Sequence, residues 1–214
     1  MSTLFAISIA GKNLRNALLE VFTTMSTYLN ALQRHQSLFQ KMIECEQSLQ
    51  LLAEQIDHCF KKGGKLFFMG NGGSAADSQH LATEFVVRYK AERAPLAAIA
   101  LTTDTSLLTA HANDYSFDTV FSRQVAALAK PEDIIIGIST SGNSANIIDA
   151  IKVAQGLGAL TWAWTGASGG ALKDIADHIL AIPATETARV QEAHIFAGHW
   201  LCEDADERAL KAAQ

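Results

Sequence analysis

The sequence is poor in the residues that mark linkers, disulfide frameworks and membrane spans. Its 214 residues include only three prolines and three cysteines. Cys45, Cys59 and Cys202 are odd in number and have no CxxC spacing, so we expect reduced thiols in the core and a cytoplasmic protein. No apolar run approaches the roughly 18 residues of a membrane-spanning helix. Lys12 and Asn13 interrupt the N-terminal segment too early for a signal peptide.

The chain also lacks an excess of positive charge. Its formal net charge of −5 argues against a surface that neutralises a nucleic-acid backbone, so we expect neither a nucleic-acid nor a membrane partner. Apolar residues make up 49% and charged residues 18%, which is typical of a globular protein. We predict a single domain over residues 1–214, with residues 1–62 as an N-terminal helical extension packed on it.

The first 60 residues show the apolar period of amphipathic helices. Apolar side chains recur at threes and fours from about Leu14 to Leu32, and again from Leu38 to Phe60. Gly63 and Gly64 then provide a helix-ending signal. The pattern predicts two helices before any strand.

The rest of the chain alternates short apolar runs with helical segments. The runs predict buried parallel strands at residues 65–69, 97–101, 134–138, 160–164 and 179–182. Helices are predicted between them at 75–89, 106–112, 119–129, 146–157 and 171–176, and a long final helix at 188–212. We therefore predict an α/β fold, a doubly wound parallel sheet of the flavodoxin-like three-layer kind, preceded by two N-terminal helices.

One unit, a strand followed by a small polar turn and a helix, occurs twice. In its second copy the turn runs from Ser139 to Ser144 and contains four hydroxyls, those of Ser139, Thr140, Ser141 and Ser144. Such a turn lies beyond the carboxyl end of a strand, where the N-terminus of the next helix favours an anion. The turn has no GK[ST] and no GxGxxG spacing, so a nucleotide is disfavoured and phosphate is the expected ligand. The alternative is an ordinary capped turn.

In the first copy the turn is Asn71-Gly72-Gly73-Ser74. The glycines allow a ligand to approach the backbone closely, and Ser74 is expected to cap the next helix. His80 and Glu84 follow in that helix at i,i+4, a spacing suited to two ligands of one metal or to an acid and a base. A His/Glu pair at this spacing is more often a surface contact.

The final helix carries polar residues within apolar sequence. Gln191 and His194 share a face, whereas Gln191 and His199 lie about 12 Å apart along the axis and about 80° apart around it. Spacing alone therefore does not select His199.

Four further histidines remain. His35, His58 and His178 are interpreted as solvated or structural, and His111 could face the site because it precedes Asn113 and Asp114.

Four segments together resemble the phosphoheptose isomerase family of the SIS (sugar isomerase) domains. They read GNGGSAADSQHLATEF, LTTDTSLLTAHANDYSFDTVFSRQVAAL, GISTSGNSANII and ARVQEAH. The resemblance runs from about Gly64 to Cys202. It implies a homotetramer with substrate pockets between subunits and one zinc ion per subunit.

The resemblance also assigns residues. It implies metal ligands at His80, Glu84, Gln191 and His199, with His194 left as a second-sphere or structural candidate. Phosphate contacts fall on Ser139, Thr140, Ser141 and Ser144. Substrate contacts further include Asn71, Gly72, Gly73, Ser74, Glu84, Asn113, Asp114 and Gln191.

The implied reaction converts sedoheptulose 7-phosphate into D-glycero-D-manno-heptose 7-phosphate, an early step towards the ADP- or GDP-heptose of bacterial lipopolysaccharide. As catalytic residues we assign Glu84 as base and His199 as acid. A metal-bound carboxylate is a poorer base, so the order of metal binding and proton transfer stays open. The alternatives are a non-catalytic SIS protein that binds a replication initiator, whose family form lacks a glutamate at position 84, and an isomerase of another sugar phosphate.

Overall fold

A computed structural model of the protein describes residues 27–212. These residues fall into two compact units that divide after Ser37. Helix α2 (Tyr28–Lys41) crosses this division, and the 3₁₀ helix η1 (Met42–Cys45) and helix α3 (Glu46–Lys61) follow it. The sheet and all residues discussed below belong to the unit that begins at Leu38.

Five parallel strands form one sheet. They are β1 (Leu66–Gly70), β2 (Ala98–Ala100), β3 (Ile134–Ile138), β4 (Leu160–Thr165) and β5 (His178–Ala181), in the spatial order β2-β1-β3-β4-β5. In the centre Leu66 is in register with Ile134, and Ile134 with Leu160. This order reverses direction between β1 and β3, the position where doubly wound folds bind ligands.

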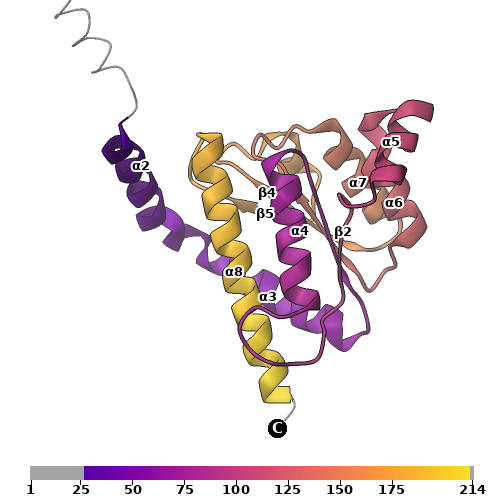
Figure 1. The fold of residues 1–214 in the computed structure, drawn as a ribbon, viewed down its shortest axis with the longest axis horizontal. Coiled ribbons are helices and arrows are strands. Elements are labelled where there is room, and N and C mark those ends of the chain that lie inside the picture. Colours follow the sequence, from indigo (N-terminus) through magenta and orange to yellow (C-terminus); the bar gives the residue numbers. More distant parts are fainter. Residues whose placement is uncertain (1–26, 213–214) are drawn as a thin grey trace, which may run out of the picture. The chain divides into compact units, whose positions relative to one another are not determined.

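Helices cover both faces of the sheet. The helices after β1 are α4 (Gly73–Val86), α5 (Thr105–Asp114), η2 (Phe117–Thr119), α6 (Val120–Leu128), α7 (Ala145–Gly156), η3 (Gly170–Asp174) and α8 (Thr187–Ala212). Side chains of α3, α4 and α8 share one buried cluster with alternate strand residues, and side chains of α6 and α7 share the other. In Figure 1, α4 and α8 run side by side over the sheet.

The predicted fold class is confirmed, because the apolar runs form five parallel strands and helices cover both faces of their sheet. Every residue of β1 and of β3 is buried. Strand bounds match the expected runs to within one residue. The segment 171–176 was expected as a helix and forms the shorter 3₁₀ helix η3.

The N-terminal prediction was wrong about where one helix ends and the next begins. Two helices were expected to meet between Leu32 and Leu38, but α2 continues to Lys41 and the break is η1. Apolar periodicity does not show a 3₁₀ turn, because three- and four-residue steps both fit it. The part of the first expected helix before Thr27 lies outside the described residues.

The structure bears on two expectations from composition, reduced cysteines and the absence of a membrane-spanning helix. Cys45, Cys59 and Cys202 are all buried and form no disulfide. Burial raises the pKa of the Cys59 thiol to about 11, so it remains protonated near neutral pH. Within residues 27–212, no helix is both long enough and apolar enough to cross a membrane.

Candidate active site

Helices α4 and α8 approach closely at Gly198. A Cβ atom at this position would lie 2.3 Å from Cδ2 of Leu81, so only glycine lets the two helices pack at this distance. Leu81 is almost fully buried and follows His80 in the chain, as His199 follows Gly198. This contact therefore fixes how far His80 and His199 lie from each other.

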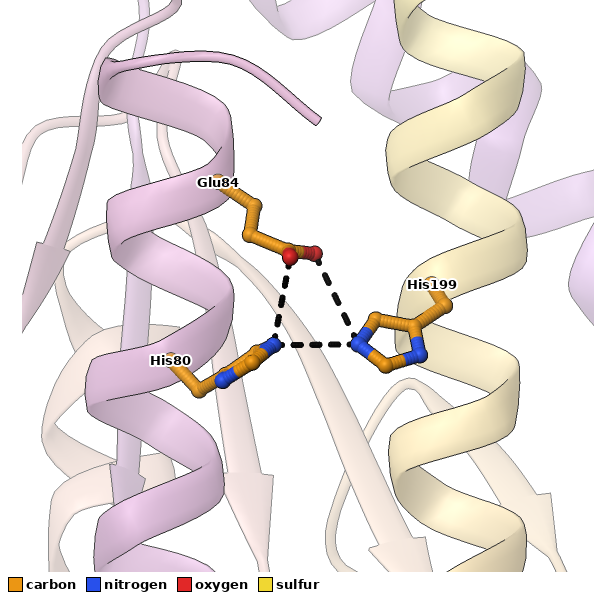
Figure 2. A group of neighbouring side chains, drawn as sticks. All are labelled: His80, Glu84 and His199. Carbon is orange, nitrogen blue, oxygen red and sulfur yellow. Dashed lines mark hydrogen bonds and ion pairs between the residues drawn. The ribbon is translucent and has the colours of Figure 1, made fainter. Parts of the chain in front are cut away.

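The three side chains His80, Glu84 and His199 converge between these helices. Figure 2 shows His80 and Glu84 of α4 pointing towards His199 of α8. The Nε2 atoms of the two histidines are 3.0 Å apart. Glu84 lies 3.2 Å from His80 through Oε1 and 3.7 Å from His199 through Oε2. One ligand atom from each residue falls within 4.8 Å of the other two.

The surroundings of the carboxylate are partly apolar and short of hydrogen-bond donors. Glu84 has a side chain that is only 18% exposed, and its buried Oε2 atom has no hydrogen-bond partner. Asp77, one turn before His80, also has a buried oxygen without a partner, and burial raises its pKa. Burial, followed by the charge of Glu84, raises the pKa of the Cys202 thiol. A cation at this position would compensate these buried acceptors.

The Ser139–Ser144 turn forms a compact hydroxyl cradle at the end of β3. Ser139 Oγ lies 2.8 Å from Ser144 Oγ and 3.5 Å from Ser141 Oγ. Ser144 is the N-cap residue of α7, yet its side chain makes no capping bond. Its hydroxyl faces the other serines, so the geometry gathers donors at the N-terminus of α7, as an anion site requires.

Neighbouring segments hold this turn rigidly. Gly142 has φ of +69°, and a Cβ there would lie 2.0 Å from the carbonyl oxygen of Gly169. The Asn143 side chain accepts a hydrogen bond from the Ala171 backbone at 2.9 Å. The glycine is therefore required both for its conformation and for close backbone packing.

A reciprocal amide pair joins the two polar turns. Asn71, after β1, and Asn146, in the first turn of α7, exchange two hydrogen bonds of 2.9 Å. Asn146 is buried. The sequence reasoning included Asn71 but missed Asn146, whose role depends on its contact with Asn71.

The turn after β1 differs from the expectation in one respect. Gly72, with φ of +57°, is the N-cap of α4 and makes no side-chain cap. Ser74 therefore lies within the helix, and the prediction that it caps α4 was wrong, because the two glycines bring the backbone into the helix earlier. Gln191 lies over this turn: a Cβ on Gly73 would be 2.6 Å from its Nε2.

The other predicted side chains do not join the His80–Glu84–His199 group. Asn113 donates to Asp114, and both are exposed at the end of α5. His111 does not face the group: it lies 2.8 Å from Thr119 Oγ1 and stacks on Tyr115.

The remaining histidines of this unit have structural or solvated positions. His194 is fully buried 3.3 Å from the Thr165 carbonyl, and burial lowers its pKa to about 4, so it is neutral near pH 7. His178 stacks on Trp162, and His58 is exposed.

Comparisons with known proteins agree with this geometry. The family model of the SIS domain matches residues 27–166. A phosphoheptose isomerase of Roseiflexus sp. (strain RS-1) is 55% identical over 152 residues, which are 71% of this chain and 77% of the relative. A phosphoheptose isomerase of Campylobacter concisus is 48% identical over 178 residues, or 83% and 94% of the two chains. The chain belongs to the phosphoheptose isomerase family of SIS domains.

The solved structures agree with this membership. A phosphoheptose isomerase from Francisella tularensis has a TM-score of 0.78 and 36% identity, with 85% of this chain and all of that chain covered. The chain is thus an enzyme of the isomerase class, and its fold is that of the family.

The three side chains of His80, Glu84 and His199, which form a histidine–carboxylate group, fit a zinc ion. Two imidazole nitrogens and a carboxylate oxygen are donors that zinc accepts. Bond lengths of about 2.0–2.1 Å in a tetrahedral site separate neighbouring ligand atoms by about 3.3 Å. The two imidazole nitrogens are 3.0 Å apart, and each lies within 3.7 Å of one Glu84 oxygen, Oε1 for His80 and Oε2 for His199. The unpartnered Oε2 of Glu84 is a further acceptor that a cation would satisfy.

Proposed function

We propose that the chain isomerises sedoheptulose 7-phosphate to D-glycero-D-manno-heptose 7-phosphate in the cytoplasm, on the route to the heptose of bacterial lipopolysaccharide. The observation that carries the proposal is the convergence of His80, Glu84 and His199 within 4.8 Å, in a unit that also contains a hydroxyl turn suited to an anion. Family membership supports the same class of reaction. An acid, a base and an anchor for the phosphate are the elements that an aldose–ketose exchange of a sugar phosphate needs.

We propose zinc as the cofactor, one ion per subunit. His80, Glu84 and His199 would hold it. Gln191 is proposed as the fourth ligand from the family resemblance alone, since its amide lies over Gly73, about two turns of α4 before His80. When bound, zinc polarises the substrate carbonyl as a Lewis acid. The measurement is metal content and affinity of the purified protein, with Gln191→Ala as the variant that tests the fourth ligand.

The substrate phosphate binds the Ser139–Ser144 cradle in this proposal. The hydroxyls of Ser139, Ser141 and Ser144 already face one another, and the Thr140 residue between them belongs to the same turn. Sugar hydroxyls contact Asn71 and the backbone of Gly72 and Gly73, with Gln191 above them. Asn113 and Asp114 are exposed and contribute only if the substrate or another subunit reaches the end of α5.

Proton transfer is assigned to Glu84 and His199. Glu84 removes the proton from carbon 1 while a proton is delivered to the carbonyl oxygen at carbon 2, which gives an enediol. Return of a proton to carbon 2 and loss of the hydroxyl proton at carbon 1 then give the aldose. His199 acts as the acid in the step in which its ring nitrogen is not bound to the metal, because a zinc-bound imidazole nitrogen carries no proton. Its exposed fraction of 35% leaves it accessible to the substrate.

Glu84 is proposed both as a metal ligand and as the base, and its two oxygens allow these roles to be divided. Oε1 is closer to His80 and Oε2 to His199. One oxygen can therefore remain a ligand while the other accepts the substrate proton. Glu84 also separates this proposal from a non-catalytic SIS protein that binds a replication initiator.

The test is incubation of zinc-loaded protein with a panel of ketose phosphates, followed by NMR detection of the aldose product. We expect turnover of sedoheptulose 7-phosphate above the other sugars. Preferred turnover of a different ketose phosphate would contradict the substrate assignment. Binding of a replication initiator in a pull-down with no turnover of any sugar would contradict the enzymatic proposal itself.

We propose further that the protein is a homotetramer with sites between subunits. Its support is an apolar groove of about 430 Å³ lined by Phe39, Met42, Ile43, Phe196 and Trp200. Ile43 is 71% exposed and Phe196 45% exposed, so a second copy would cover them. Light scattering of the wild-type protein and of Ile43→Glu tests this. We expect the mass of a tetramer for the wild type and a smaller mass for Ile43→Glu, and a wild-type mass equal to that of one chain would contradict the proposal.

A further inference from the structure

A buried arginine closes the C-terminal end of α4. The last carbonyl groups of any α-helix lack partners within the helix. Arg93 supplies partners here: Nη2 donates to the Glu84 carbonyl at 2.9 Å and Nη1 to the Phe85 carbonyl at 2.8 Å. Its side chain is only 2% exposed. The hydrogen bond to Glu84 falls on the peptide group of the proposed metal ligand and base.

The charge of Arg93 is balanced by Asp206 of α8. Nε of Arg93 donates to Asp206 Oδ1 at 2.7 Å, and Oδ2 accepts from the backbone of Lys90 and Ala91, each at 2.8 Å. Burial alone raises the pKa of Asp206, but these hydrogen bonds outweigh it and the net pKa is lowered. The carboxylate is therefore ionised and fully bonded, which a buried charge requires.

Arg93 contacts α4 and Asp206 belongs to α8, the two helices that carry the histidine–carboxylate group. Asp206 follows His199 by seven residues, or two helical turns, so both lie on the same face of α8 about 10 Å apart along the axis. Arg93 holds the α4 residue that faces His199. The pair thus connects the helix that carries Glu84 to the helix that carries His199 through buried groups alone.

We infer that Arg93 and Asp206 are positioning residues that set the rotation and depth of Glu84 against His199, and so the affinity of the metal site. This inference rests on the proposed zinc site. A point ammonium cannot reproduce the arginine fork, because Lys has no planar set of donors that reaches two carbonyls and a carboxylate at once. Groups that orient ligands in this way affect metal affinity by about 10- to 100-fold.

The chain contains a matched control. Lys90 and Glu203 also link the segment after α4 to α8, through an ion pair of 2.8 Å, but their side chains are 63% and 48% exposed. Neither side chain contacts the Glu84 peptide in the hydrogen bonds of the structure. Glu203→Gln therefore removes a bridge between the same two segments without touching the buried pair.

The experiment compares wild type, Arg93→Lys, Asp206→Asn and Glu203→Gln in two measurements. Zinc affinity is determined by competition with a chelator. We expect a loss of about tenfold or more in Arg93→Lys and Asp206→Asn, and a change below about twofold in Glu203→Gln. Wild-type affinity in Arg93→Lys would overturn the inference.

The second measurement is made without metal, so that it does not depend on the proposed cofactor. NMR signals of the His80 and His199 rings report their geometry, and we expect them to shift in Arg93→Lys but not in Glu203→Gln. Unchanged ring signals would overturn the inference even if zinc binds. Shifted ring signals in a protein whose wild type binds no zinc would support the positioning role and refute the proposed cofactor.

Urea unfolding separates positioning from general destabilisation. The core variant Phe85→Leu lies in the same turn of α4 as Glu84 and lowers stability without removing Arg93 or Asp206, the two residues of the buried clamp. If it weakens zinc binding as much as Arg93→Lys at equal loss of stability, the positioning role is refuted.

Discussion

The hydroxyl cradle at Ser139–Ser144 and the histidine–carboxylate group between α4 and α8 differ in how the chain builds them. All four hydroxyls of the cradle come from one turn of six residues, and local packing against Gly169 and Ala171 fixes its shape. His80 and His199 are 119 residues apart, and their 3.0 Å contact depends on the packing of two helices. In the proposed function the cradle alone binds an anion, whereas the histidine–carboxylate group supplies the chemistry.

The comparison predicts that the two regions contribute separately to binding and turnover. The largest expected effect is that of Glu84→Gln. Loss of the proposed base should lower kcat by about 10³-fold, since general acid–base catalysis contributes roughly 10²–10⁴. Phosphate binding to the cradle should be unchanged, and the NMR turnover assay with calorimetric titration of inorganic phosphate measures both.

Glu207→Gln, an exposed residue of α8 paired with Lys211, serves as the control and should retain wild-type activity. Full turnover by Glu84→Gln would remove Glu84 from the mechanism.

His194 connects the two regions, because it joins α8 to Thr165, next to the Gly166 amide that donates to Thr140. Its pKa is about 4 in the folded protein and about 6.5 when unfolded. The unfolded state thus binds more protons between these values, so stability is full above pH 6.5 and falls as the pH decreases towards 4.

The loss of unfolding free energy is on the order of 3 kcal/mol. Urea unfolding from pH 7.5 to 4.5 should show it, and His194→Gln should reduce the slope. An identical slope in His194→Gln would show that other groups cause the acid sensitivity.

Gly198→Ala tests whether the histidine–carboxylate group depends on helix packing. The added methyl group meets Leu81 at 2.3 Å and should cost about 1–3 kcal/mol by overpacking. It should also weaken zinc binding by moving α8 away from α4. The second change Leu81→Ala makes room for the methyl group and should restore part of the zinc affinity.

In the same protein, the affinity of the cradle for inorganic phosphate should stay at the wild-type value. Equal losses at both sites would mean that the two regions are not built independently.

The smallest effect is expected in the cradle itself. Ser144→Ala removes one hydroxyl that lies 2.8 Å from Ser139. We expect KM to rise about tenfold with kcat nearly unchanged, because one hydrogen bond to a charged group contributes about 1.5 kcal/mol. Steady-state kinetics measure both constants, and a fall in kcat alone would assign Ser144 to the chemical step.

Much of the fold was predictable because each signal is local. Fully buried strands such as Ile134–Ile138 appear as continuous apolar runs. The Ser139–Ser144 turn is recognisable from its composition of small polar residues. Local reasoning was wrong where the backbone competed with a side chain, as at Ser74, where two glycines start the helix before the serine. It also missed Asn146, whose role exists only beside Asn71.

The sequence by itself determined the parallel sheet, the helices around it and the hydroxyl-rich turn before α7, because these follow from periodicity and from residues close together in the chain. Tertiary structure decided which polar residues meet. His199 was chosen over His194 only by resemblance, and the buried clamp of Arg93 and Asp206 left no sequence signal. Such contacts depend on the distance and rotation between two helices, which Gly198 and Leu81 set by close packing and which no local pattern encodes.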